Sequence, residues 1–236
     1  GIQLKKLSNK MTKFAKIIHK NKENFLIKKF TALFKRKIKD KKKGRISFVL
    51  TGGKSPIKLY RHLSKDRKIP WGKVDFFIGD ERCISENSKY SNINMCKKSL
   101  LNKIPITNKQ IYKISINKKN PKKISKDYEK KIKKYFLKRK VCFDLVLLGI
   151  GKDGHIASLF KNNIDKKNKK IVDFINRKDF TRITLTLSCL NNSKNIFLWA
   201  PGKNKINIVK KILSDQKASY PASLIKVKNK FLFYSN

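Results

Sequence analysis

Residues 144–160, Asp-Leu-Val-Leu-Leu-Gly-Ile-Gly-Lys-Asp-Gly-His-Ile-Ala-Ser-Leu-Phe, run from an apolar strand into a glycine-rich turn. The apolar run of residues 144–149 is continuous rather than alternating, which predicts a buried parallel strand. In open α/β sheets, ligands bind at the turns that follow the carboxyl ends of such strands. This turn carries His155 two residues after Asp153. A carboxylate fixes the tautomer of a nearby imidazole, so the pair indicates acid–base chemistry, although a lone histidine is more often structural.

A second predicted strand, residues 45–51, also ends in a glycine turn, Gly52-Gly53-Lys54-Ser55-Pro56. An amphipathic helix is predicted over about 56–65, with Pro56 in its first turn and Ser55 as its cap. Two glycines let the backbone approach an anion, and the helix N-terminus adds partial positive charge. A Gly-Gly pair alone is usually an ordinary turn, and neither dinucleotide-binding nor Walker spacing is present. The recurrence of strand, glycine turn and helix favours a phosphate-binding turn.

A third predicted strand, residues 74–78, ends at Gly79 and a charged cluster, Asp80-Glu81-Arg82. A guanidinium near a phosphate-binding turn offers bidentate recognition of phosphate oxygens. Arg82 is therefore a candidate phosphate ligand. For Asp80 and Glu81, a solvated turn explains the sequence equally well.

Five segments, in this order and spacing, resemble the 6-phosphogluconolactonase branch of the glucosamine-6-phosphate isomerase/6-phosphogluconolactonase family. They are residues 51–56, 79–83, 90–92, 149–160 and 182–187, and the resemblance runs from about residue 22 to the C-terminus. It implies a Rossmann-like α/β fold. It also implies hydrolysis of 6-phosphoglucono-δ-lactone to 6-phosphogluconate, a step of the oxidative pentose phosphate pathway, without a metal or other cofactor.

The resemblance and the donor chemistry together assign roles to the candidate site residues. The catalytic set is His155 as general base, Asp153 as the group that orients it, and Arg82 or a glycine-turn N–H as the oxyanion donor. The substrate-binding set is Thr51, Gly52, Gly53, Ser55, Asp80, Arg82 and Lys205. For Lys205, a solvated surface lysine is an equally good interpretation.

The loop at residues 51–56 departs from the family pattern. The family has Ser-Gly-Gly-Ser-Thr-Pro where this chain has Thr-Gly-Gly-Lys-Ser-Pro. Hydroxyl groups persist at both flanks, and Lys54 adds a charge in the middle. Phosphate binding is expected to survive this change.

A glucosamine-6-phosphate deaminase is the nearest alternative function, because the deaminases share the fold and the glycine–histidine segment. In their pattern, the histidine is followed by Ala-Phe-Asn-Glu-Pro, whose glutamate completes an acid–base relay. This chain has Ala157-Ser158-Leu159-Phe160 instead. It also has Glu81-Arg82 where the deaminases have Glu-Tyr, which again favours the lactonase.

A polyanion-binding protein is the other alternative, because 61 Lys and Arg residues against 15 Asp and Glu give a formal net charge of +46. Such a charge is typical of nucleic-acid-binding proteins. The excess is mostly Lys and is spread over every predicted helix, which favours compositional drift. We expect at most weak, non-specific association with nucleic acid.

Alternating helices and strands predict an α/β fold with a mostly parallel sheet and helices on both faces. The expected helices span about 8–20, 22–41, 56–65, 91–101, 121–138 and 203–213. The expected strands span about 45–51, 74–78, 111–114, 143–149, 181–187, 195–200 and 230–234. Residues 162–170, rich in Lys and Asn, are predicted to form a mobile loop.

The length and composition favour one domain spanning residues 1–236, a single α/β sugar-phosphate lactonase domain. Nowhere do 18 apolar residues run together, and the N-terminal region has no apolar core suited to a signal peptide. We therefore expect a cytoplasmic protein with no membrane partner and a small sugar phosphate as its ligand. The four cysteines lack metal-ligand spacing, so no metal site is expected. The oligomeric state is left open.

Overall fold

The central sheet of the molecule is parallel throughout. The computed structural model describes residue 14 and residues 16–116 and 120–236. Within them, seven strands lie in the order β1-β10-β9-β6-β2-β3-β5, and every neighbouring pair is parallel. The strands are β1 (Lys16–Lys20), β2 (Ile46–Leu50), β3 (Val74–Ile78), β5 (Ile111–Tyr112), β6 (Leu145–Gly149), β9 (Asn195–Ala200) and β10 (Asn229–Ser235). The predicted mostly parallel sheet is confirmed.

The middle strands of this sheet are apolar along their whole length because both of their faces are covered. Every residue of β2, β3 and β9 is buried. Such strands carry continuous apolar runs, whereas a strand with one wet face alternates. The continuous apolar run that predicts each of these strands therefore also indicates that the strand lies in the middle of the fold.

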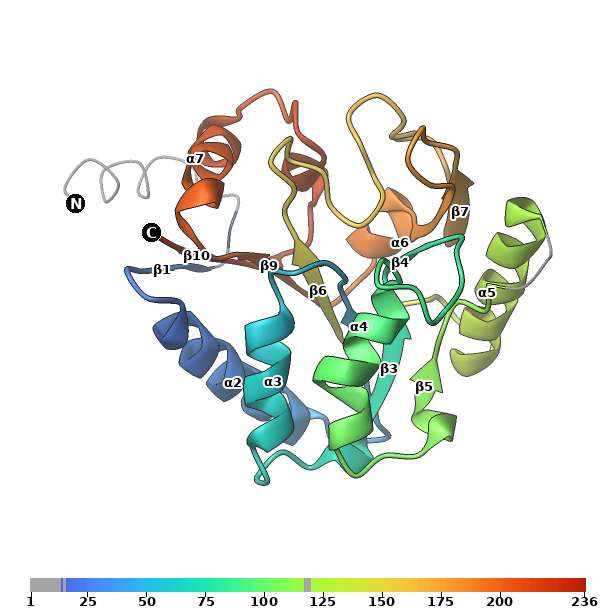
Figure 1. The fold of residues 1–236 in the computed structure, drawn as a ribbon, viewed down its shortest axis with the longest axis horizontal. Coiled ribbons are helices and arrows are strands. Elements are labelled where there is room, and N and C mark those ends of the chain that lie inside the picture. The colour runs from blue at the N-terminus through green and yellow to red at the C-terminus, as the bar shows by residue number, and fades with distance from the viewer. Residues whose placement is uncertain (1–13, 15, 117–119) are drawn as a thin grey trace.

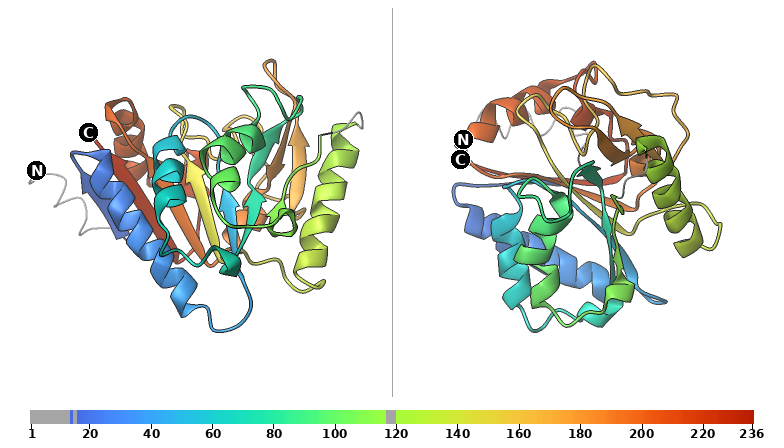
Figure 2. Two further views of the ribbon diagram at one scale, coloured as in Figure 1. Left: turned by 60° about the horizontal axis from the view of Figure 1, so that its bottom comes forward. Right: turned by 45° about the vertical axis from the view of Figure 1, so that its right-hand side comes forward.

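Helices cover both faces of the sheet, as the sequence predicts (Figures 1 and 2). One face carries α2 (Glu23–Asp40), α3 (Ile57–Lys65) and α4 (Asn92–Ser99), and the other carries α7 (Ile206–Ser214) and the short α6 (Leu187–Asn191). Helix α5 (Pro121–Tyr135) lies towards the β5 end of the sheet. Short 3₁₀ helices are η1 (Trp71–Lys73), η2 (Leu101–Lys103), η3 (Asn108–Gln110), η4 (Lys203–Lys205) and η5 (Pro221–Leu224).

A small antiparallel sheet lies beside the carboxyl ends of the central strands. Its order is β4-β8-β7, with β4 (Asp80–Arg82), β8 (Arg182–Leu185) and β7 (Val172–Ile175). Strand β4 follows β3 after Gly79 alone, and the Leu185 N–H donates to the Gly79 carbonyl at 2.9 Å. The small sheet therefore fixes the charged residues that leave β3.

Two sequence expectations about local structure are wrong, and three elements are missed. A helix was expected over 8–20, but residues 16–20 form the edge strand β1, paired with β10; residues 8–13 and 15 lie outside the described part. Strands β4 and β7 and helix α6 were not predicted. Ser55 does not cap α3, because Pro56 occupies the N-cap position and no side chain caps that end. Residues 162–170 form turns without strand or helix; their mobility stays a prediction.

None of the helices in the described part of the chain combines the length and the apolar character needed to cross a membrane.

Candidate active site

The turns that follow the central strands converge on one cavity of about 500 Å³. Its walls come from the turns after β2 and β6, from β4 and β8, and from the segment after β9. The residues lining it are Glu23, Thr51, Gly52, Gly53, Lys54, Ser55, Lys58, Asp80, Arg82, Asn92, Gly149, Ile150, Gly151, His155, Ala157, Arg182, Pro201, Asn204 and Lys205. All the substrate-binding candidates, together with His155 and Arg82, are therefore brought together. Asp153 is absent from the wall and contacts His155 instead.

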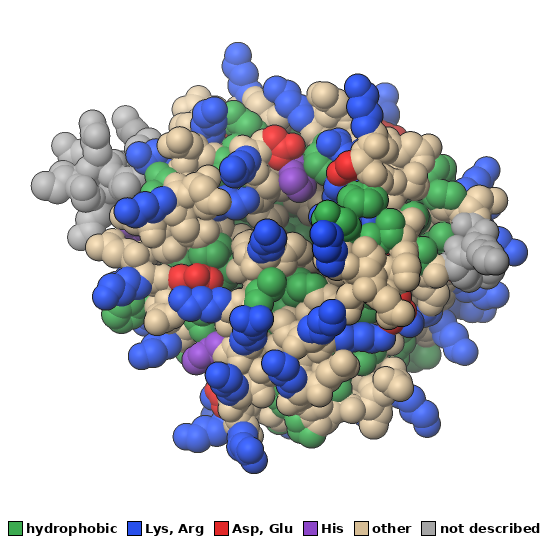
Figure 3. Space-filling model, viewed as in Figure 1, with side chains coloured by type: hydrophobic (Ala, Val, Ile, Leu, Met, Phe, Trp, Pro, Cys, Tyr) green, Lys and Arg blue, Asp and Glu red, His purple; other side chains and the backbone are tan. Residues whose placement is uncertain are grey.

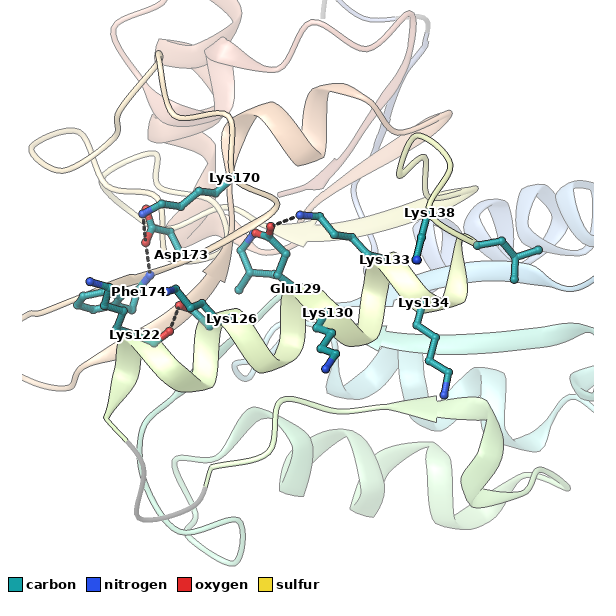
Figure 4. A pocket seen from close by; sticks show the side chains of 13 residues that line it. Lys122, Lys126, Glu129, Lys130, Lys133, Lys134, Lys138, Lys170, Asp173 and Phe174 are labelled. Carbon is teal, nitrogen blue, oxygen red and sulfur yellow. Dashed lines mark hydrogen bonds and ion pairs between the residues drawn. The ribbon is translucent and has the colours of Figure 1, made fainter.

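A larger hollow of about 1020 Å³ lies elsewhere, between α5 and β7 (Figure 4). Its walls are mostly lysine side chains, and its two carboxylates are already paired: Lys133 reaches Glu129 and Lys170 reaches Asp173. It contains no glycine turn and no histidine. The smaller cavity is therefore the candidate active site.

The turn after β6 holds His155 in a defined orientation. The Gly151 N–H donates to the His155 carbonyl and the Gly154 N–H to the Gly151 carbonyl, both at 2.9 Å. Gly154 has a φ of +82°, and a Cβ on Gly151 would lie 2.0 Å from the His155 Nδ1. Both positions therefore require glycine.

Asp153 fixes the imidazole by hydrogen bonding. Its Oδ1 lies 2.5 Å from the His155 Nδ1 and accepts the His155 backbone N–H at 3.2 Å. Burial opposes ionisation of Asp153, but these hydrogen bonds outweigh it and lower the pKa of the carboxyl group. An ionised Asp153 holds the proton on Nδ1, which leaves Nε2 as the basic nitrogen.

The turn after β2 packs closely against Asn92 and against the end of β6. Gly53 has a φ of +80°, and a Cβ on Gly52 would lie 1.9 Å from the Asn92 Oδ1. The Thr51 Oγ1 accepts the Gly149 N–H at 3.2 Å, which ties this turn to the end of β6. Ser55 is held through its carbonyl, which accepts the Trp199 indole N–H at 3.1 Å.

Strand β4 presents Asp80 and Arg82 at the cavity. The buried Asp80 accepts the Ser158 hydroxyl at 2.6 Å, and the Asn92 side-chain amide donates to its carbonyl at 2.7 Å. The Arg82 Nη1 donates to the Tyr90 carbonyl at 2.6 Å. Glu81 points elsewhere and accepts the backbone N–H groups of Asn92 and Ile93 at the start of α4. Asp80 and Arg82 thus line the cavity, whereas Glu81 holds the start of α4.

Lys205 lies at the start of α7, close to the turn after β6. Its Nζ donates to the Ile150 carbonyl at 2.6 Å. Burial, and then the nearby charge of Lys152, lower the pKa of this lysine. It is a half-buried cation that lines the cavity, rather than a fully solvated one.

Residues 21–233 match the family of glucosamine-6-phosphate isomerases/6-phosphogluconolactonase. The chain belongs to this family. It is 30% identical over 213 residues to the 6-phosphogluconolactonase of Thermotoga maritima, covering 89% of this chain and 92% of that protein. It is 32% identical over 195 residues to the Rattus norvegicus 6-phosphogluconolactonase, covering 78% and 75% of the two proteins. The crystal structure of the T. maritima enzyme superposes with a TM-score of 0.82 at 28% identity, covering 93% of this chain and 98% of that one.

A monomeric glucosamine-6-phosphate deaminase shares the fold, with a TM-score of 0.80 at 19% identity over 94% of this chain and 97% of that one. At this identity the likeness shows the fold alone. The two branches of the family must therefore be separated by the residues in the cavity.

Sequence reasoning missed several residues of this family member's cavity, above all Arg182. Its side chain is 10% exposed, its Nη2 bonds the Asp179 Oδ2 at 2.5 Å, and it lies opposite Arg82 in the β4–β8 pairing. The Nε–H groups of both arginines are buried without a partner among the described residues. The sequence signal that could have identified Arg182 is its place as a cation at the start of the family-like segment 182–187. Asn92 lies in the segment 90–92 and Lys58 on the helix that follows the glycine turn, whereas Glu23 left no such signal because a separate helix, α2, supplies it.

Across the described residues, no group of three or more His, Cys, Asp or Glu side chains is arranged to hold a metal ion. A metal-free reaction stays a prediction.

Proposed function

We propose that the protein hydrolyses 6-phosphoglucono-δ-lactone to 6-phosphogluconate, as a step of the oxidative pentose phosphate pathway. The observation that carries this proposal is the Asp153–His155 pair, which opens onto the same cavity as a glycine turn and several cations. An imidazole fixed through Nδ1 is a general base for water, and the glycine turn suits a phosphate group. Family relatives named 6-phosphogluconolactonase support the same reaction.

His155 begins the reaction by taking a proton from water on Nε2, while the water oxygen attacks the lactone carbonyl carbon. The carbonyl π electrons move to oxygen and form a tetrahedral oxyanion. The oxyanion then collapses, the bond from carbon to the ring oxygen breaks, and the imidazolium returns its proton to that oxygen. The product is an open-chain carboxylic acid that ionises at neutral pH. No covalent enzyme intermediate is needed.

The oxyanion requires hydrogen-bond donors in the cavity wall. The guanidinium of Arg82 and the N–H groups of the glycine turns are the donors we assign to it. Arg182 adds a third source, since it lies opposite Arg82 and lines the same cavity. Asp153 stabilises the imidazolium that forms during the reaction.

The phosphate group is assigned to the other part of the cavity, where the turn at residues 51–55 meets Lys205. Backbone N–H groups of Gly52 and Gly53 and the hydroxyl of Ser55 are donors there, and Arg82 and Lys205 supply charge. Asp80 accepts hydroxyl groups of the sugar.

The deaminase reaction is disfavoured by the cavity wall. The residues after His155 are Ile156, Ala157 and Ser158, and Ser158 is occupied in a hydrogen bond to Asp80. The carboxylates lining the cavity are Asp80 and Glu23, and Glu23 lies 3.7 Å from Lys58. Among the described residues that line the cavity, no free glutamate is available to complete an acid–base relay with the histidine.

A polyanion-binding function has no localised surface to support it. On the face shown in Figure 3, Lys and Arg side chains are spread widely rather than gathered into one patch. Diffuse charge produces weak, salt-sensitive association rather than a defined site.

The decisive test is a lactonase assay with freshly generated substrate in a chelating buffer, compared with spontaneous hydrolysis. We expect acceleration by the parent protein, no ammonia release from glucosamine 6-phosphate, and a fall in kcat of about 10² to 10⁴ in His155→Asn. The matched control is His62→Asn, an exposed histidine on α3. Affinity for 6-phosphogluconate should be kept. Rates equal to spontaneous hydrolysis would refute the proposal, and near-parental kcat in His155→Asn would refute the mechanism alone.

A further inference from the structure

The phenylalanine that ends the catalytic segment lies against the imidazole. Phe160 is 6% exposed, and its ring centroid is 4.4 Å from that of His155, with the planes inclined by 31°. The Arg177 guanidinium carbon is 3.6 Å from the same Phe160 centroid. Two groups this close cannot share one face of a six-membered ring without overlapping. His155 and Arg177 therefore lie on opposite faces of Phe160, in a three-layer stack.

Arg177 is held in this stack by the loop that joins β7 to β8. Its Nε lies 3.6 Å from the Asp179 Oδ1, while the other oxygen of Asp179 accepts the Arg182 Nη2 at 2.5 Å. The Arg182 guanidinium lies 5.4 Å from the Phe160 centroid. Burial opposes ionisation of Asp179, but the Phe180 N–H and Arg182 outweigh it and lower the pKa of the carboxyl group. An ionised Asp179 thus fixes both guanidiniums around one aromatic ring.

We propose that Phe160 and Arg177 are positioning residues for His155: Phe160 fixes the plane of the imidazole, and Arg177 clamps Phe160. The inference rests on the proposed role of His155 as general base. Asp153 fixes one edge of the imidazole through Nδ1, but a single hydrogen bond leaves the ring free to tilt. The flat face of Phe160 removes that freedom, and Arg177 holds the opposite face of Phe160.

The test of the clamp is Arg177→Gln, with Lys178→Gln as the matched control. Lys178 is the next residue of the same loop and is exposed, so both variants lose one positive charge. Arg177→Gln removes the cation from the face of Phe160, so kcat should fall about two- to fivefold with little change in KM. Lys178→Gln should leave kcat unchanged. Arg177→Lys keeps a cation at this position and should keep most of kcat.

The test of the plane is Phe160→Leu against Phe160→Tyr. Leucine removes the flat face, so kcat should fall about ten- to a hundredfold while KM changes less than about threefold. Tyrosine keeps the ring and should keep most of kcat.

The NMR signal of the imidazole Cε1 proton, assigned through its loss in His155→Asn, reports the same packing without any lactonase assay. Its chemical shift should move in Phe160→Leu, which removes the aromatic ring next to the imidazole, and should stay near the parental value in Phe160→Tyr, even if the substrate has been assigned wrongly. An unchanged chemical shift or a parental kcat in Phe160→Leu would overturn the inference while leaving the lactonase proposal standing.

Discussion

Lys205 provides the sharpest test of how the substrate phosphate is held. Its ammonium group has three N–H donors, of which one is used by the Ile150 carbonyl at 2.6 Å. Two donors remain for the cavity. Lys205→Met keeps most of the side-chain volume and removes both. A charge-assisted hydrogen bond contributes about 1.5–3 kcal/mol, so kcat/KM should fall about ten- to a hundredfold.

The loss should appear almost entirely in KM. We would measure kcat and KM with the phosphorylated lactone and with glucono-δ-lactone, which has no phosphate. The matched control is Lys203→Met, an exposed lysine two residues earlier that does not line the cavity. Only Lys205→Met with the phosphorylated substrate should show a raised KM. Because burial and Lys152 lower the pKa of Lys205, its charge is lost at a lower pH than that of an ordinary lysine, and the parental KM should rise early on the alkaline side.

Two results would refute this reasoning. An unchanged KM in Lys205→Met would show that the ammonium makes no contact with the phosphate. An equal loss with the unphosphorylated lactone would show that Lys205 acts by holding the Ile150 carbonyl, and so the turn that carries His155.

Three further predictions follow from other contacts. Gly52→Ala places a methyl group 1.9 Å from the Asn92 Oδ1, so KM should rise at least about tenfold; an unchanged KM would show that Asn92 moves aside freely. Asp144→Ala removes the acceptor for Lys41, Lys194 and Ser47, which should cost about 1–3 kcal/mol in urea unfolding at pH 7. Burial opposes ionisation of Asp144, but these partners outweigh it and lower the pKa of the carboxyl group. The stability that Asp144 contributes is therefore present above about pH 4 and is lost as the pH falls through the pKa of the folded state. A difference in unfolding free energy between the parent and Asp144→Ala that stays constant at acid pH would contradict this. Binding to duplex DNA should be sequence-independent and weaken steeply between about 50 and 200 mM salt, and tight selective binding at high salt would contradict diffuse charge.

The sequence predicts the turns that line the cavity better than it predicts the edges of the fold. Strands β2, β3 and β6 are buried on both faces, so each has a continuous apolar run, and a glycine lies within two residues after each strand. The carboxyl ends of parallel strands meet at one edge, so the turns after them converge without any knowledge of distant contacts. His155, Arg82 and the turn at residues 51–55 are found in this way.

Residues placed by long-range pairing could not be found in this way. Arg182 reaches the cavity because β8 pairs antiparallel with β4, in a register that sets it opposite Arg82. Strand β1 is a strand because β10 offers an open edge, although residues 16–20 taken alone also fit a helix. In both cases the partner lies far away in the sequence, and local propensity contains no information about it.

The cations of the cavity differ from the other basic residues that produce the net charge of +46, because hydrogen bonds hold their side chains in place. Lys205 is tied to the Ile150 carbonyl, Arg82 to the Tyr90 carbonyl and Arg182 to Asp179. The charge of an exposed lysine is screened within about 8–10 Å at physiological salt. An exposed lysine also loses side-chain entropy when it binds a ligand, whereas a half-buried cation with a fixed hydrogen bond has already lost that entropy on folding. We therefore propose that recognition of a sugar phosphate depends on these three oriented groups, and that the surface charge contributes mainly to the rate of encounter.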